Sequence, residues 1–426
     1  MERQVEEGKT LLVSGPTSIT LTDGRAKVLG SYLKLHEKVV IRRGKTLPFE
    51  AEENSVFDVV LSERSSIEEV EGSTITDSWR KTTEEVLAHP KPCTVLTLGG
   101  VDCGKTTFCT FLANRALALG LRTVVIDADL GQSSIGPPAT IGLSLVQEPV
   151  SDLFYLKAQS TFFAGITSPS SITERVIEGV SSLKQQAEDI TAQFTIINTD
   201  GWIQGESAKE FKSSLIRSIL PQAIIGIQHV NELEHIFNPA EEEGFKIFRL
   251  KPSPAVRIRG REARRELREQ GYKKFLRGNT LRSLPISWIQ LEYTPLGKGN
   301  SLNGNGLNRI GESIGCRIIY CEETPKELFI VLEEGQSINE KNAKLEELPK
   351  KKLYVVNDGY EEGLLVGLLD QNRQFLGLGV ISKVDYERQS LKLFTSCKEK
   401  ISIVQFGQMK INTNGGELGV TKSFST

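Results

Sequence analysis

A glycine-rich segment between an apolar run and an amphipathic stretch constrains this chain more than any other feature. Residues 99–106 read Gly-Gly-Val-Asp-Cys-Gly-Lys-Thr and fit the pattern G-x-x-x-x-G-K-[ST]. The apolar run at 94–98 predicts a strand, and the stretch that begins at Thr106 predicts a helix. This order is typical of a phosphate-binding loop, in which backbone N–H groups and a helix N-terminus face an anion. The segment predicts a nucleoside triphosphate site; the alternative is a chance glycine-rich turn.

Within this loop, two side chains have a predicted role in binding ATP and Mg²⁺. We expect Lys105 to reach the β- and γ-phosphates, and the hydroxyl of Thr106 to coordinate Mg²⁺. The expected nucleotide-binding set is Gly99, Gly100, Val101, Asp102, Cys103, Gly104, Lys105, Thr106 and Thr107.

Length, charge and cysteine content narrow the class of protein. A chain of 426 residues is too long for a single core, so we expect two or three domains. The net charge of −2 excludes a uniformly basic nucleic-acid coat. The six cysteines form no C-x-x-C pair and the four histidines are dispersed, so we predict a reduced, cytoplasmic protein without a Cys/His metal site. No window approaches the roughly 18 apolar residues of a membrane span, so we expect no membrane partner.

The pattern of apolar runs predicts an α/β P-loop NTPase core, flanked by N-terminal and C-terminal β-rich domains. We expect a β domain over 1–76, followed by a helical linker at 77–93. Its predicted strands are the short apolar runs 10–13, 18–21, 26–29, 38–41 and 57–61, and residues 22–24 and 43–45 are predicted turns between them. From 94 to 283, near-continuous apolar runs alternate with helical stretches, which predicts a doubly wound, mainly parallel sheet. Short strands return over 284–426, and we expect the glycine- and asparagine-rich segment 296–306 to form a mobile loop.

A second landmark is the apolar run 124–126, which ends in two carboxylates, Asp127 and Asp129. In a P-loop fold, an acid at this edge of the sheet holds Mg²⁺ or lies near the attacking nucleophile. Two acids one residue apart point to opposite faces of a strand, so we expect them to have different roles. The alternative is that both merely cap the strand end.

Four segments together resemble a known family. Residues 99–107, Asp127-Ala-Asp-Leu-Gly-Gln132 and Thr199-Asp-Gly-Trp202 resemble the Walker A, Walker B and clasp motifs of polynucleotide 5′-hydroxyl kinases. The segment 257–268 resembles the arginine-rich lid of that family. The family includes the RNA kinase subunits of pre-mRNA cleavage, tRNA splicing and rRNA processing, with shorter archaeal relatives. The resemblance implies a kinase that transfers the γ-phosphate of ATP to the 5′-hydroxyl of RNA or DNA.

The lid resemblance coincides with the strongest local charge in the chain. Residues 251–276 contain nine Lys or Arg and three Glu. A solvated helix with Glu–Arg pairs is the alternative, but like charges recur at the i,i+4 spacing and oppose it. By matching positions, the resemblance assigns phosphate contacts to Arg259, Arg264 and Arg268, which with Lys105 and Asp129 make up the expected catalytic set. Lid arginines can stabilise the charge of a transferring phosphoryl group.

The resemblance also suggests how the acceptor is bound. It makes Asp129 the base that takes the proton of the 5′-hydroxyl, while Asp127 supports Mg²⁺ or its waters, although the division between the two acids stays open. The expected acceptor-binding residues are Gln132, Thr199, Gly201 and Trp202, with the indole of Trp202 stacking on a terminal base. The alternative for Trp202 is packing beneath a neighbouring helix.

Two other functions remain open from the sequence. One is a nucleotide-loaded scaffold without turnover, in a complex with RNA-processing proteins. The other is a P-loop switch ATPase, although the second loop position, which carries an additional lysine in the partitioning and metal-cluster-assembly ATPases, is Gly100 here. The sequence does not separate RNA from DNA acceptors, because the 2′-hydroxyl contact has no linear signature.

Overall fold

The computed structural model describes residues 1–338 and 350–421 and divides the chain into two units, 1–268 and 269–426. The first unit contains the N-terminal β region and the P-loop core; the second contains the C-terminal β region. The described helices are α1 (Asp77–Leu87), α2 (Lys105–Ala118), α3 (Thr173–Asp189), α4 (Glu206–Ile219), α5 (Glu234–Glu242), α6 (Arg261–Phe275) and α7 (Gly304–Ile314), with single 3-10 turns at Leu153–Tyr155, Pro169–Ser171 and Ile286–Trp288.

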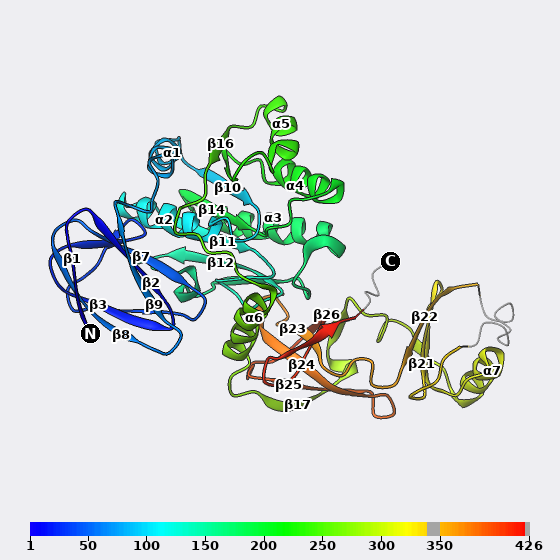
Figure 1. Ribbon diagram of the computed structural model, residues 1–426. Coiled ribbons are helices and arrows are strands. Elements are labelled where there is room, and N and C mark those ends of the chain that lie inside the picture. Colours follow the sequence, from blue (N-terminus) through cyan, green and yellow to red (C-terminus); the bar gives the residue numbers. More distant parts are fainter. Residues whose placement is uncertain (339–349, 422–426) are drawn as a thin grey trace. The chain divides into compact units, whose positions relative to one another are not determined.

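A seven-stranded sheet forms the middle of the first unit (Figure 1). Its order is β13-β12-β11-β14-β10-β15-β16, and the five strands from β11 to β16 in this order are parallel. The predicted parallel sheet is therefore present, with an antiparallel pair, β12 and β13, added at one edge. The strand bounds are β10 Cys93–Gly99, β11 Thr123–Ala128, β12 Thr140–Val146, β13 Ser160–Phe163, β14 Phe194–Thr199, β15 Ala223–Ile227 and β16 Ile247–Leu250.

Helices cover both faces of this sheet, as a doubly wound fold requires. Apolar residues of α3, α4 and α5 pack with one face, and those of α1 and α2 pack with the other. In α3 the buried residues Val176, Val180, Leu183 and Ala187 recur every three or four positions, so one stripe of the helix faces the sheet. The carboxyl ends of the parallel strands consequently meet at one edge, where ligands bind in such folds.

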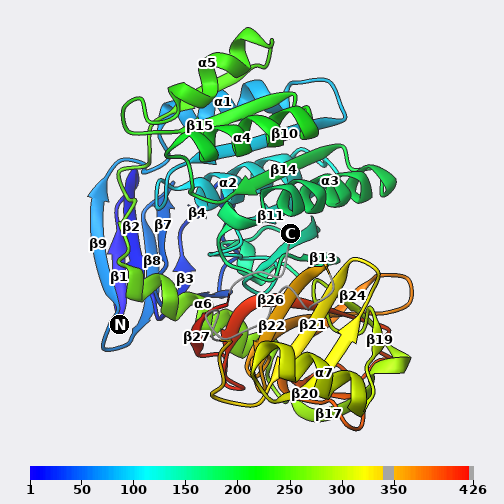
Figure 2. The same cartoon turned by 90° about the vertical axis from the view of Figure 1, so that its right-hand side faces the viewer.

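The N-terminal region contains two antiparallel sheets, which are blue in Figure 2. One has the order β1-β8-β3-β6 and the other β5-β4-β7-β2-β9. Five of these strands match the predicted runs, while β1, β5, β7 and β9 were not predicted. The bounds are β1 Glu2–Val5, β2 Lys9–Ser14, β3 Thr17–Asp23, β4 Ala26–Val28, β5 Ser31–Tyr32, β6 Lys38–Ile41, β7 Thr46–Ala51, β8 Ser55–Leu61 and β9 Ser66–Glu71.

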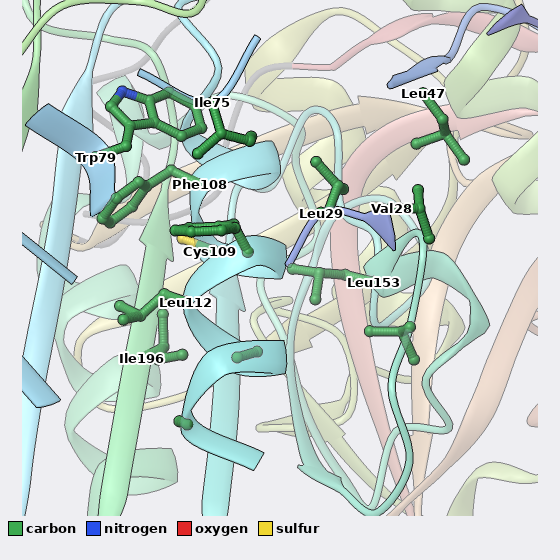
Figure 3. Packing of buried hydrophobic residues seen from close by; sticks show 14 of the residues in the cluster. Val28, Leu29, Leu47, Ile75, Trp79, Phe108, Cys109, Leu112, Leu153 and Ile196 are labelled. Carbon is green, nitrogen blue, oxygen red and sulfur yellow. The ribbon is translucent and has the colours of Figure 1, made fainter. Parts of the chain in front are cut away.

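This N-terminal region shares one hydrophobic core with helix α2. Figure 3 shows Leu29 from the N-terminal region beside α2, on the other side of the helix from Phe108 and Leu112, and all three belong to one buried apolar cluster. The side chain of Asn114 on α2 donates to the carbonyl oxygens of Leu29 and Val150, each at 2.9 Å. The predicted boundary near residue 76 therefore separates two architectures but does not divide the core.

The second unit contains two further sheets and helix α7. The larger sheet runs β17-β25-β24-β23-β26-β18 with β27 beside β26, and the smaller runs β19-β20-β21-β22. The bounds are β17 Thr280–Pro285, β18 Gln290–Glu292, β19 Asn300–Ser301, β20 Ile318–Glu323, β21 Glu327–Leu332, β22 Lys352–Asn357, β23 Leu364–Leu369, β24 Phe375–Asp385, β25 Ser390–Thr395, β26 Ile403–Ile411 and β27 Glu417–Val420.

Two expectations differ from the structure in this region. The boundary predicted at residue 283 falls inside β17, which pairs with β25 of the C-terminal sheet. The end of the predicted loop 296–306 belongs to α7, because Asn303 caps that helix by accepting from Gly306 N. The start of the loop is held by the buried carboxylate of Glu322, which accepts from the backbone N–H groups of residues 297, 298 and 299. Residues 339–349 and 422–426 of the predicted domain lie outside the described residues.

One buried carboxyl makes the stability of the second unit depend on pH. Burial raises the pKa of Glu361 to about 7, although the Tyr386 hydroxyl donates to this carboxyl. An acid with a raised pKa in the folded state favours folding while it is protonated, and this contribution is lost as pH rises through the folded-state pKa. We expect chemical denaturation to show lower stability of this unit at pH 8 than at pH 5. Glu361→Gln should flatten that dependence, whereas Glu362→Gln, an exposed neighbour, should retain it.

Candidate functional site

The phosphate-binding loop lies between β10 and α2, as predicted. Gly99 ends β10, and a Cβ there would lie 2.5 Å from Cys103 Sγ and 2.7 Å from the carbonyl oxygen of Ile227, so only glycine fits. Gly104 begins α2 with a φ of 100° and supplies no side-chain cap. The first N–H groups of the helix therefore keep their hydrogen-bonding capacity for an anion.

Lys105 lies inside this loop rather than extending from it. Its side chain is buried, and its ammonium donates to the carbonyl oxygens of Gly99 at 2.9 Å and Gly100 at 2.6 Å. These bonds hold a positive charge at the centre of the loop. A phosphate contact from Lys105 would exchange these carbonyl partners for phosphate oxygens.

Asp127, at the end of β11, is fully buried and engaged by three donors. Its Oδ1 accepts from Asn198 Nδ2 at 2.9 Å and Asp129 N at 3.2 Å, and its Oδ2 accepts from Ser134 N at 2.5 Å. Burial raises its pKa, while these hydrogen bonds act in the opposite direction. Asn198 Nδ2 also lies 3.3 Å from the Thr106 hydroxyl, so one amide connects the two predicted metal-binding residues.

These oxygens fit Mg²⁺ held mainly through water. Mg²⁺ takes oxygen ligands, retains several waters and is bound by one or two protein groups together with substrate phosphates. The Thr106 hydroxyl stands at the first turn of α2, and Asp127 is joined to it through Asn198. Because three donors already occupy its oxygens, Asp127 is better arranged to orient waters than to surround a metal ion.

Asp129 differs from Asp127 in what its two oxygens do. Its Oδ1 accepts from the backbone N–H groups of Gly131 at 3.2 Å and Gln132 at 3.0 Å, which folds the loop after β11 around one side of the carboxylate. Its Oδ2 accepts no hydrogen bond from any described residue. Burial and the charge of Asp127 raise the pKa of Asp129 to about 6, while Lys105 opposes this shift. A partly exposed carboxylate with one unused oxygen suits a proton acceptor.

The end of β14 and the turn after it carry three of the predicted acceptor-binding residues, Thr199, Gly201 and Trp202, and the turn touches the phosphate-binding loop. A Cβ on Gly201 would lie 2.7 Å from the backbone nitrogen of Val101, so this close approach requires glycine. Thr199 is buried, and its hydroxyl donates to the Thr97 carbonyl oxygen at 2.8 Å. Thr199 therefore ties β14 to β10, and its buried side chain is committed to the fold.

Trp202 packs against a helix, as in one of the two predicted alternatives, and its stacking on a base stays a prediction. Its ring is partly buried and stacks on Phe211 of α4, with centroids 5.9 Å apart and an angle of 24° between the planes. Its backbone N–H donates to Asp200 Oδ1 at 2.8 Å. The indole thus packs against a helix on one face while part of its surface remains exposed.

A buried ion pair supports this turn. Lys212 on α4 has no exposed side-chain surface, and its ammonium donates to Asp200 Oδ2 at 2.6 Å. Burial lowers the pKa of Lys212, and Asp200 acts in the opposite direction. The carboxylate of Asp200 therefore bridges the backbone of Trp202 and the helix on which its ring rests.

The lid arginines reach the phosphate-binding loop through Asp102. Asp102 Oδ1 accepts from Arg259 Nε at 2.8 Å and Nη2 at 2.5 Å, while Oδ2 accepts from Arg259 N at 2.9 Å and Arg264 Nη1 at 3.3 Å. Gln132 Nε2 donates to the Arg264 carbonyl oxygen at 3.2 Å, which joins the Asp129 loop to the lid. Arg268 is partly buried one helical turn beyond Arg264.

Three residues of this site were not identified from the sequence. Asn198 and Lys212 gave no signal, since an amide in an apolar run and a lysine in an amphipathic helix are common. Lys45, in a segment interpreted only as a turn, comes from the N-terminal region and is 23% exposed. Burial lowers its pKa, Asp152 opposes this shift, and Arg259 and Asp127 are close enough to contribute. Among the described residues, no three His, Cys, Asp or Glu side chains form a metal-binding group.

The Lys212–Asp200 pair predicts a measurable coupling. Removing one partner leaves the other charge buried and should cost about 3–5 kcal/mol of stability. We expect Lys212→Gln and Asp200→Asn each to destabilise the unit strongly, and the double variant to be more stable than either single one in a denaturation cycle. Arg217 lies on the same helix as Lys212 and forms an exposed pair with Glu243. Arg217→Gln breaks this pair and should change stability by less than about 1 kcal/mol. Additive effects of the two buried substitutions would contradict this coupling.

Comparison with known proteins agrees with this geometry. The family described as "mRNA cleavage and polyadenylation factor CLP1 P-loop" matches residues 99–278. A solved Clp1p–Pcf11p complex contains a chain with the same fold: the match covers 96% of this chain and 97% of that one, at 12% identity and a TM-score of 0.67. Among the described residues, no helix combines the length and apolar character needed to cross a bilayer.

Curated relatives share a higher sequence identity with this chain than the solved structure does. The polyribonucleotide 5′-hydroxyl-kinase of Methanocaldococcus jannaschii is 30% identical over 334 residues, which are 78% of this chain and 90% of the relative. That of Pyrococcus abyssi is 28% identical over 79% of this chain and 93% of the relative. A protein CLP1 homolog of Brugia malayi is 26% identical over 65% of this chain and 67% of the relative. With the phosphate-binding loop, the acidic strand end, the clasp turn and the lid together in one unit, this chain belongs to the polyribonucleotide 5′-hydroxyl-kinase family.

Proposed function

We propose that this protein is an ATP-dependent polynucleotide 5′-hydroxyl kinase that transfers the γ-phosphate to the 5′-OH of RNA or DNA. The archaeal relatives that align with 78–79% of this chain are named polyribonucleotide 5′-hydroxyl-kinase. The observation that carries the proposal is the free oxygen of Asp129, which belongs to the same unit as the phosphate-binding loop and the lid arginines.

Phosphoryl transfer depends on positioning the reactants and on stabilising the negative charge of the transferring phosphoryl group. The N-terminus of α2 and Lys105 bind the triphosphate tail, and Arg259, Arg264 and Arg268 supply positive charge to the γ-phosphoryl oxygens. Thr106, together with waters oriented by Asp127, would hold Mg²⁺, which would supply positive charge to the phosphates. Each of these groups would act in the chemical step without a covalent enzyme intermediate.

Asp129 Oδ2 is the proposed proton acceptor for the incoming 5′-hydroxyl. Its partner oxygen is fixed by Gly131 N and Gln132 N, so the free oxygen has a defined direction. The hydrogen bond from the Gln132 side-chain amide to the Arg264 carbonyl oxygen joins the loop after this base to the lid. Trp202 would hold the terminal base, because stacking on an indole does not depend on the identity of the base.

Removing the proposed base should stop transfer while ATP still binds. We expect Asp129→Asn to lower kcat by a factor of about 10²–10⁴, with the Kd for ATP changed by less than about threefold. Labelled-phosphate transfer to a 5′-OH oligonucleotide and calorimetric ATP binding measure the two quantities. Asp189→Asn, an exposed acid at the end of α3, is the control. Loss of ATP binding in Asp129→Asn would give Asp129 a metal-binding role instead.

The proposed stacking role of Trp202 separates acceptor binding from ATP binding. We expect Trp202→Ala to cost about 1–3 kcal/mol of acceptor binding, a rise of about 5- to 150-fold in the acceptor KM, with little change in the KM for ATP. Trp202→Phe keeps an aromatic face and should lie between Ala and the wild type. An unchanged acceptor KM in the alanine variant would rule out the stacking role.

The same assay tests the proposed function as a whole. Wild-type protein should transfer the γ-phosphate of ATP to 5′-OH oligonucleotides in the presence of Mg²⁺. Single- and double-stranded acceptors of RNA and of DNA should be compared side by side. Folded protein that binds ATP but transfers no phosphate to any of these acceptors would refute the proposal and favour the scaffold alternative.

A further inference from the structure

A carboxylate at the mouth of a polyphosphate site is unexpected on electrostatic grounds. Asp102 stands in the phosphate-binding loop, where it would repel a triphosphate, since like charges a few ångströms apart oppose one another. Its side chain is only 2% exposed. A buried carboxylate must be compensated by donors, and here all the donors to its side chain come from the lid.

We propose that Asp102 is the positioning residue that holds Arg259 and Arg264 over the phosphate-binding loop. This inference rests on the proposed function for the role of the arginines, but the contact itself is independent of it. Asp102 is thus a fixed point to which the lid is attached.

The hydrogen bonds leave each guanidinium with donors for a phosphate. Arg259 uses Nε and Nη2 on Asp102, and Arg264 uses Nη1 on Asp102 and on the carbonyl oxygen of Arg259 at 2.9 Å. Nη1 of Arg259 and Nη2 of Arg264 donate to no described residue. A guanidinium presents its donors in a rigid planar fork, so fixing one edge determines the direction of the other.

Two other ion pairs of the lid are more exposed. Arg257 pairs with Glu68, and Arg43 pairs with Glu266, each at 2.9 Å, but the side chains in both pairs are 40% exposed or more. Exposed pairs contribute about 0–1 kcal/mol because water screens them. Asp102 is therefore the most buried of these three carboxylate partners of the lid.

The substitution Asp102→Asn isolates the charge. Asp102 has a φ of 55°, and asparagine tolerates this left-handed conformation as well as aspartate does. The amide has nearly the same shape, but an NH₂ group replaces one of the two acceptor oxygens. This group would face the guanidinium or backbone N–H donors of the lid. Glu266→Gln is the matched control, since it removes one exposed ion pair from the same lid.

Two measurements test the proposal. Without nucleotide, limited trypsin digestion should cut the Asp102→Asn lid within residues 257–268 about tenfold faster than the wild type. With ATP and a 5′-OH oligonucleotide, kcat should fall at least about tenfold while the KM for ATP stays within about twofold, because misplaced groups lose transition-state contacts. Glu266→Gln should resemble the wild type in both measurements.

The outcomes separate this inference from the proposed function. Unchanged lid protection together with unchanged kcat would overturn the positioning role. A lower KM for ATP at unchanged kcat would also overturn it, because the carboxylate would then only repel the triphosphate. If the wild type transfers no phosphate but Asp102→Asn still exposes the lid, the positioning role stands and the kinase proposal fails.

Discussion

The backbone of the phosphate-binding loop is the reference against which every other part of the site is placed. On one side, the clasp turn approaches Val101 so closely that only Gly201 fits. On the other, the lid is bound to Asp102. A loop that must face an anion with its own N–H groups cannot move far, since each displacement removes a hydrogen bond. The positions of the clasp turn and the lid are therefore set by their contacts with this loop.

Buried polar groups extend this framework behind the loop. Asn198 connects Thr106 to Asp127, and the Lys212–Asp200 pair supports the turn that carries Trp202. Groups of this kind are costly unless every partner is present, so they fix one arrangement of the site. By contrast, three residues proposed to contact substrates, Asp129, Arg259 and Arg264, keep unused hydrogen-bonding capacity.

The sequence predicted the parallel sheet and the phosphate-binding loop because both depend on local patterns. Apolar runs such as 94–98 and 194–197 are long enough to identify buried strands, and the family prediction is confirmed by the archaeal relatives. The antiparallel strands β12 and β13 were not predicted, and helix α7 was missed because its glycine- and asparagine-rich start is typical of a loop. Lys45, Asn198 and Lys212 were missed for a different reason: each lies far in sequence from the groups it influences. The roles of the individual site residues remain predictions.

The core shared by the N-terminal sheets and α2 has a consequence for how this architecture can change. Leu29 and Phe111 lie in the same apolar interior, and Asn114 binds the backbone on both sides of it. The N-terminal strands therefore act as one wall of the nucleotide-binding fold rather than as an appendage. A lineage could not exchange this region for an unrelated module without leaving α2, and the phosphate-binding loop that precedes it, facing water.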